Sequence, residues 1–110
     1  MEEKIPGMIN IILTNDIHLR KINIDYLDRD YFTDIITFNY SESQVVNGDL
    51  FISLERVNEN ARKFGEEKEI ELLRVMIHGV LHLIGYDDAY ADDKKQMRNK
   101  ENKYLASFTG

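Results

Sequence analysis

The chain has 110 residues, of which 43% are hydrophobic and 31% charged, the balance of a single folded domain over residues 1–110. The net charge of -6 disfavours binding to nucleic acid or anionic membranes through overall charge, and the absence of cysteine excludes disulfides and thiolate metal sites. No apolar run is long enough to span a membrane, and the N-terminus lacks the pattern of a secretory signal, so we expect a cytoplasmic protein.

The chain is predicted to begin with a strand and a short helix. Residues 8–13, MINIIL, form a β-branched apolar run of strand length. Asn15 or Asp16 can cap a helix that continues to about residue 27, although the apolar spacing there fits a helix only in part.

Two further strands are expected before the helical half of the chain. Residues 33–38, TDIITF, alternate and are β-branched, and residues 50–53 form a second short apolar segment. Between them, NYSESQVV has the composition of a polar loop. Asn47 and Gly48 are predicted to turn the chain into the second of these strands.

The second half is predicted to be helical. Ser53 can cap a helix that Gly65 ends, and residues 66–84 form a helix that is apolar on nearly all sides and therefore mostly buried. Gly85 ends that helix, and residues 89–105 form the last one. Its expected core contacts are Met97, Tyr104 and Leu105. Strands early and helices late predict an α+β fold, a small mixed sheet packed on helices with a central buried helix.

The segment HGVLHLIGYDD in that buried helix carries the candidate chemistry. His78 and His82 are one helical turn apart, so both imidazoles can be directed at one point. Gly85 can adopt a left-handed conformation that turns the chain back and brings Asp88 to the pair as a third ligand. Three protein ligands and an open position are typical of a catalytic zinc.

Other interpretations of these histidines are weaker. A lone histidine in an apolar helix is usually a hydrogen-bonded core residue, but a pair followed by a glycine and an acid is harder to explain by packing. Zinc peptidases with an HExxH motif place a glutamate where this chain has Gly79. Non-haem iron oxygenases commonly take their ligands from strands. His18 lies in a polar stretch and is expected at the surface.

The segment resembles the HGxLHLxGYDH motif of the bacterial YbeY family, metal-dependent endoribonucleases that act in ribosomal RNA maturation. The similarity continues outside the motif and covers about residues 9–105. TDIITF resembles the family's TDVLSF, GDLFIS resembles its GDIxIS, and Met97 with Glu101 resembles its MxxxE helix.

The resemblance places the family's first two zinc ligands on His78 and His82 and its third, a histidine, on Asp88. A carboxylate oxygen suits zinc, so the site is expected to persist, with one Zn²⁺ per chain and less discrimination against Ni²⁺ or Mn²⁺. These three residues are the expected catalytic set, acting through a metal-activated water. The family's members also usually carry more chain ahead of the first strand seen here.

A second departure concerns phosphate binding. The arginine that follows the tyrosine of the family's YRxxDxxT segment is replaced by Leu27, after Tyr26. If that arginine handles phosphate, Arg29 or Arg74 could take its place, although each is at least as well explained as a solvated surface charge.

The resemblance implies a zinc-dependent endoribonuclease that cleaves single-stranded RNA, with ribosomal RNA and the ribosome as partners in rRNA maturation and ribosome quality control. Asp34, Asp49 and Asp87 are candidates for fixing the histidine tautomers, although Asp34 and Asp49 can equally just end strands. Two alternatives stay open: a non-catalytic ribosome-assembly or RNA-binding factor with a structural metal, and a hydrolase of another small substrate.

Overall fold

The computed structural model describes residues 5–86 and 91–109. Within these residues the chain forms a mixed sheet and helices, so the expected α+β class is confirmed. No helix in this described part is long and apolar enough to cross a membrane. The elements in chain order are β1 (Ile5–Thr14), α1 (Asp16–Leu27), β2 (Ile35–Asn39), β3 (Val45–Ser53), α2 (Leu54–Phe64), α3 (Lys68–Leu83) and α4 (Ala91–Thr109).

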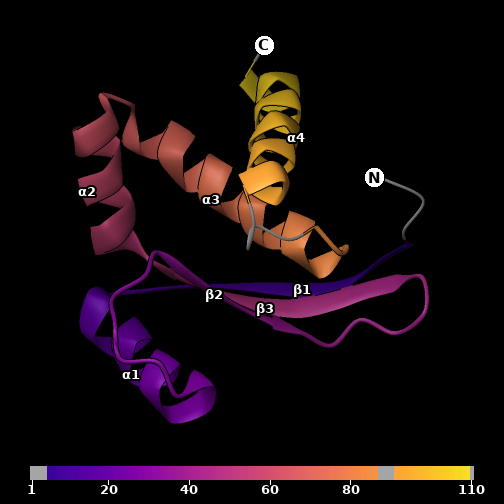
Figure 1. The fold of residues 1–110 in the computed structure, drawn as a ribbon, viewed down its shortest axis with the longest axis horizontal. Coiled ribbons are helices and arrows are strands. Elements are labelled where there is room, and N and C mark those ends of the chain that lie inside the picture. Colours follow the sequence, from indigo (N-terminus) through magenta and orange to yellow (C-terminus); the bar gives the residue numbers. More distant parts are fainter. Residues whose placement is uncertain (1–4, 87–90, 110) are drawn as a thin grey trace.

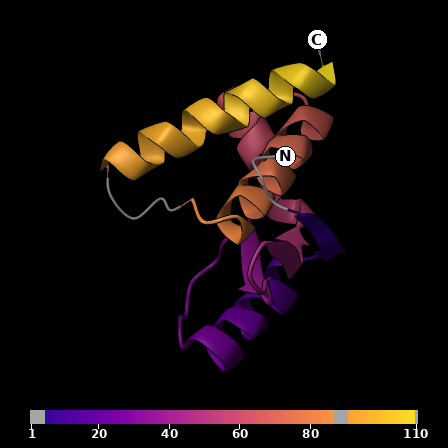
Figure 2. The same ribbon diagram turned by 90° about the vertical axis from the view of Figure 1, so that its right-hand side faces the viewer.

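Helix α1 lies on one side of the sheet, and α3 and α4 lie on the other (Figure 1). Its strand order is β1-β3-β2, with β1 parallel and β2 antiparallel to β3. Figure 2 shows α1 below the sheet, α3 above it and α4 across the top. Because α3 packs against the sheet on one side and α4 on the other, its side chains from residue 70 onward are buried or half-buried.

Both predicted helix caps are confirmed. The Asn15 side chain accepts a hydrogen bond from the backbone N–H of His18, and the Ser53 hydroxyl accepts one from that of Arg56. Each bond satisfies a backbone donor that the first helical turn leaves without a partner. Gly65 ends α2 with a φ of 65°, the left-handed conformation expected of a glycine in this position.

The predicted turn at Asn47 and Gly48 is wrong, because both residues lie inside β3. The chain instead reverses at residues 40–44, where Ser43 has a φ of 55° and Glu42 pairs with Val45. A Cβ atom on Gly48 would lie 2.5 Å from a methyl carbon of Leu83. The glycine therefore allows α3 to approach β3 closely, a requirement that local turn propensity cannot reveal.

Helix α3 also meets the sheet directly at Gly79. A Cβ atom there would lie 2.7 Å from Ile35 Cδ1 and 3.0 Å from the methyl carbons of Leu50. A glutamate at this position would be directed into the sheet, which gives a physical reason why this helix has no HExxH motif. On its opposite side α3 packs against α4 through a cluster of Ile77, Leu81, Met97 and Leu105, with Tyr104 half-buried beside it.

Candidate metal centre

The structure brings His78 and His82 together. They lie on successive turns of α3, and their Nε2 atoms are 3.0 Å apart. The ring centroids are 4.6 Å apart, with an angle of 76° between the ring planes. Two nitrogen ligands on one tetrahedral zinc, with bonds of about 2.0–2.1 Å, would be separated by about 3.3 Å. The two nitrogens are at hydrogen-bond distance from each other, slightly closer than two ligands of one zinc ion would be.

Glu101 of α4 fixes the orientation of His78. Its carboxylate Oε2 lies 2.6 Å from His78 Nδ1. An ionised carboxylate can only accept a hydrogen bond, so Nδ1 carries the proton in this contact, and Nε2 is the ring nitrogen through which a neutral His78 could bind a metal. This is the carboxylate–histidine arrangement that commonly supports metal ligands.

Sequence reasoning missed this role of Glu101 and considered three aspartates instead. A usable pattern was present, because Glu101 is four residues after Met97 and four before Leu105, on the face of α4 that enters the core. Glu101 is only 5% exposed. A buried acid on an apolar helix face needs a partner from another element, and here that partner is His78.

Two arginines accompany the buried carboxylate. Arg98 Nη1 lies 3.5 Å and Arg74 Nη1 lies 3.8 Å from Glu101 Oε1. Arg74 also donates a 2.8 Å hydrogen bond to Asn102 Oδ1, which holds α3 against α4. Arg74 lines the cavity between α2, α3 and α4, where its side chain is 15% exposed and engaged in these contacts.

The structure places two of the candidate aspartates. Asp34, just before β2, lines the cavities on both sides of His78, and burial raises its pKa although the nearby His78 opposes this. Asp49 lies within β3 and accepts a hydrogen bond from Asn10 of β1, so the suggestion that it ends a strand is wrong. Asp87 and the predicted third ligand, Asp88, lie outside the described residues.

Within residues 5–86 and 91–109, no group of three or more His, Cys, Asp or Glu side chains is arranged to hold a metal. What the described part contributes is the pair of imidazoles and the carboxylate that orients one of them. Imidazole nitrogens are common ligands of zinc and similar divalent ions, so the two histidines could supply part of a metal site.

A cavity of about 450 Å³ opens beside the two histidines. The loop after α1 and strand β2 form its other walls. Its lining includes Asn23, Leu27, Arg29, Asp34, His78 and His82. Arg29 therefore shares a cavity with both histidines, in addition to donating a 3.3 Å hydrogen bond to the Tyr31 hydroxyl. Leu27, where the family pattern has arginine, lines the same cavity.

Asn23 positions the loop that carries Arg29. Its carbonyl oxygen accepts hydrogen bonds from the backbone N–H groups of Asp28 and Arg29, and its side-chain amide donates to the Tyr31 carbonyl. Asp28 has a φ of 54°, which turns the chain sharply at the end of α1. Asn23 is 1% exposed, and no sequence motif pointed to it. The only local sign of its role is that Asn23 follows Ile22 on the buried face of α1, where a polar side chain needs a hydrogen-bond partner.

Comparisons with known proteins agree with this architecture. The family model described as Endoribonuclease YbeY matches residues 1–109. The chain is 47% identical over 107 residues to Endoribonuclease YbeY of Flavobacterium johnsoniae, covering 97% of this chain and 77% of that protein. It is 50% identical over 91 residues to the Chlorobium limicola protein of the same name, covering 83% of this chain but 63% of the relative.

A solved structure supports the same fold. The solution structure of TM1509 from Thermotoga maritima superposes with a TM-score of 0.64 at 36% sequence identity. The match covers 88% of this chain and 65% of that one. The chain thus spans a little under two thirds of the Chlorobium limicola protein and of TM1509.

Proposed function

The chain belongs to the YbeY family of endoribonucleases, and from that premise we propose that it is a metal-dependent nuclease that cleaves single-stranded RNA during ribosomal RNA maturation. The observation that carries the proposal is the 3.0 Å approach of His78 Nε2 and His82 Nε2 at the wall of a cavity that also contains Arg29. The proposed setting is the cytoplasm, where precursor ribosomal RNA is processed, with ribosome association and quality control as part of the same role.

Zinc is the proposed ion, with nickel and manganese as alternatives. His78 and His82 would hold it through Nε2, and Asp88 would complete the set. When bound, such an ion supplies Lewis acidity and lowers the pKa of water to near neutrality. Glu101 keeps the His78 proton on Nδ1, so that Nε2 stays available as a ligand.

The side chains around the histidines suit a phosphodiester. Arg29 supplies a guanidinium that can pair with phosphate oxygens, which compensates for Leu27 in the family's arginine position. Its loop is held by the hydrogen bonds to Asn23, so the cation is positioned before RNA binds. A local cation is needed because the net charge of -6 repels RNA at long range.

The direct test compares cleavage of single-stranded RNA by wild type and His82→Ala with saturating Zn²⁺. We expect cleavage by wild type and a loss of at least about 100-fold in the variant, since one ligand is removed. His18→Ala is the matched control, because His18 is exposed and bonded to Thr14 at 2.6 Å. Equal rates for wild type and His82→Ala would disprove the catalytic proposal. Peptides and small phosphoesters are assayed in parallel. Hydrolysis of these substrates but not of RNA would indicate another kind of hydrolase.

One rival has an observation in its favour. Leu27 lines the cavity where the family pattern has arginine, which suits an RNA-binding factor whose metal is only structural. Chelation separates the two. We expect the metal-free protein to stay folded, because α3 and α4 are joined by a buried apolar cluster and the Glu101 contacts. Unfolding on treatment with EDTA would favour the structural metal.

A further inference from the structure

A second cavity lies on the other side of His78. It has a volume of about 420 Å³ and is bounded by α2, α3 and α4. We call it the α2–α4 cavity. His78 and Asp34 line both this cavity and the one that contains Arg29, so the two hollows meet at the candidate metal centre. A chain molecule bound at the histidines could therefore extend from one into the other.

The outer part of the α2–α4 cavity is basic. Lys94 and Arg98 line it from α4, one helical turn apart; Lys94 is exposed, and the Arg98 side chain is 61% exposed. Two acids of the same cavity lie deeper, with Glu71 at 7% and Glu101 at 5% exposure, and the third, Asp34, is half-buried. Glu101 is compensated by His78 and by the guanidinium groups of Arg74 and Arg98. On the α4 side, an approaching ligand thus meets Lys94 and Arg98 before the two buried glutamates.

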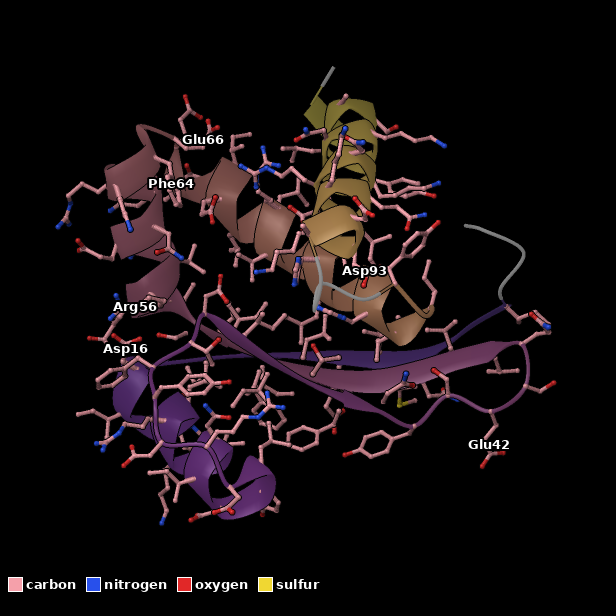
Figure 3. The ribbon with its side chains drawn as sticks, in the orientation of Figure 1. Asp16, Glu42, Arg56, Phe64, Glu66 and Asp93 are labelled. Atoms are coloured by element: carbon pink, nitrogen blue, oxygen red, sulfur yellow. The ribbon has the colours of Figure 1, made fainter. Side chains whose placement is uncertain are left out.

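The opposite rim, on α2, offers an aromatic ring and an amide. Phe64 is 65% exposed at the C-terminal end of α2, where Figure 3 shows it beside the turn into α3. Asn60, one turn earlier, also lines the cavity. An exposed phenylalanine opposite a pair of cations has the chemistry of a nucleotide-binding groove, in which a base stacks on the ring and a phosphate pairs with the basic groups.

We propose that the α2–α4 cavity binds a nucleotide next to the scissile phosphate, with Lys94 and Arg98 contacting its phosphate and Phe64 stacking on its base. The assignment rests on the proposed function, because it takes the bound polymer to be single-stranded RNA. Asn60 can hydrogen-bond the base or sugar. The subsite explains how an acidic chain retains RNA, since the cations are concentrated at one groove.

The test measures binding of a fluorescent single-stranded RNA of about ten nucleotides by anisotropy over a range of salt concentrations. We expect Phe64→Ala to raise the Kd about tenfold, because a stacking surface is lost. Lys94→Ala should also weaken binding and should reduce the slope of log Kd against log salt by about 0.7, the effect of one phosphate contact on a single strand. Lys94→Arg should restore both quantities.

Lys95→Ala is the matched control, because Lys95 is an exposed neighbour on α4 that does not line the cavity. If Phe64→Ala and Lys94→Ala bind RNA with the Kd and salt slope of Lys95→Ala, the subsite assignment is wrong, whether or not RNA is cleaved. The same holds if the wild type does not bind RNA at low salt. If the wild type leaves the RNA intact but binds it through Lys94 and Phe64, the nuclease proposal fails and the subsite stands.

Discussion

Two polar networks join helices in this protein. One consists of hydrogen bonds and an ion pair within the protein, and the other leads to two histidines at the wall of a cavity. At the junction of α1, β3 and α2, Asp16 accepts hydrogen bonds from Ser53 Oγ at 2.6 Å and from Arg56 Nη2 at 2.8 Å. Figure 3 shows Asp16 and Arg56 side by side there. At the junction of α3 and α4, Glu101 holds His78, whose Nε2 faces His82 at the wall of a cavity.

We expect the first network to contribute to stability and the second to contribute to metal binding. Both oxygens of Asp16 are engaged by donors of the protein itself, so the first network holds α1 and α2 to the sheet without any ligand. The second network directs two ring nitrogens to one point, an arrangement that a bound cation would stabilise. Substitutions in the first network should therefore change folding, and substitutions in the second should change metal affinity.

The largest expected effect is on metal affinity in His82→Ala. Removing one of two converging imidazoles should weaken Zn²⁺ binding by more than about 100-fold, beyond the usual effect of a supporting residue. The free energy of unfolding of the metal-free protein should change by less than about 1 kcal/mol, because His82 is only half-buried. Competition with a chromophoric chelator and urea unfolding give the two quantities. If His82→Ala instead lost much unfolding free energy and kept its Zn²⁺ affinity, the proposed difference between the two networks would be wrong.

Asp16→Asn should lower the unfolding free energy and leave the metal affinity unchanged, the reverse of His82→Ala. We expect a loss of about 2 kcal/mol of unfolding free energy, because charged hydrogen bonds to a side chain that is 16% exposed are weakened. Zn²⁺ affinity should not change. Asp30→Asn is the control, since its ion pair with Arg20 is exposed and should contribute less than about 0.5 kcal/mol.

The contribution of Asp16 should also depend on pH. Burial opposes ionisation, but the hydrogen bonds from Ser53 and Arg56 outweigh it and lower the pKa of Asp16 below its ordinary value of 3.8. Its stabilisation is therefore complete above that value and is lost as the pH falls through the lowered pKa of the folded state. The difference between wild type and Asp16→Asn should shrink in acid. A difference that grows in acid would contradict this assignment.

Glu101→Gln should have an intermediate effect. The amide oxygen can still accept from His78 Nδ1, but without the charge that favours this tautomer, so Zn²⁺ affinity should fall about tenfold. Glu69→Gln makes the same change of charge at an exposed position on α3 and should leave affinity unchanged. Equal affinities for the two variants would show that Glu101 only holds α4 in place.

The smallest effect is expected at Glu71, close to the second network. Burial raises the pKa of Glu71 above its ordinary value of 4.5. Its ionisation is therefore unfavourable in the folded state, and Glu71→Gln should increase the unfolding free energy at about pH 7 by less than about 1 kcal/mol. The gain should vanish below the ordinary pKa, where the acid is protonated in both states. Urea unfolding at about pH 4 and about pH 7 tests this, and a less stable variant at neutral pH would contradict it.

Local features of the chain were predictable because the interactions that produce them span only a few residues. Asn15 and Ser53 cap helices through bonds to residues three positions later, and Gly65 ends α2 through its own backbone conformation. The spacing of His78 and His82 likewise determines that both rings lie on one side of α3.

Interactions between distant segments were not predictable from these patterns. Asn47 and Gly48 have the composition of a turn, but β3 runs through them because Leu83 of α3 needs the space that a Cβ atom would occupy. Among the described residues, the hydrogen-bond partner of His78 Nδ1 is Glu101, 23 residues away on another helix.

By itself, the sequence determined the caps of α1 and α2, the α+β class and the placement of His78 and His82 on one side of α3, since hydrogen bonds and side-chain periodicity within one element depend on adjacent residues. Only the tertiary structure decided that Glu101 orients His78 and that Arg29 shares the cavity of both histidines. Those relations arise when separate elements pack, and the packing is set by the whole core rather than by any one segment.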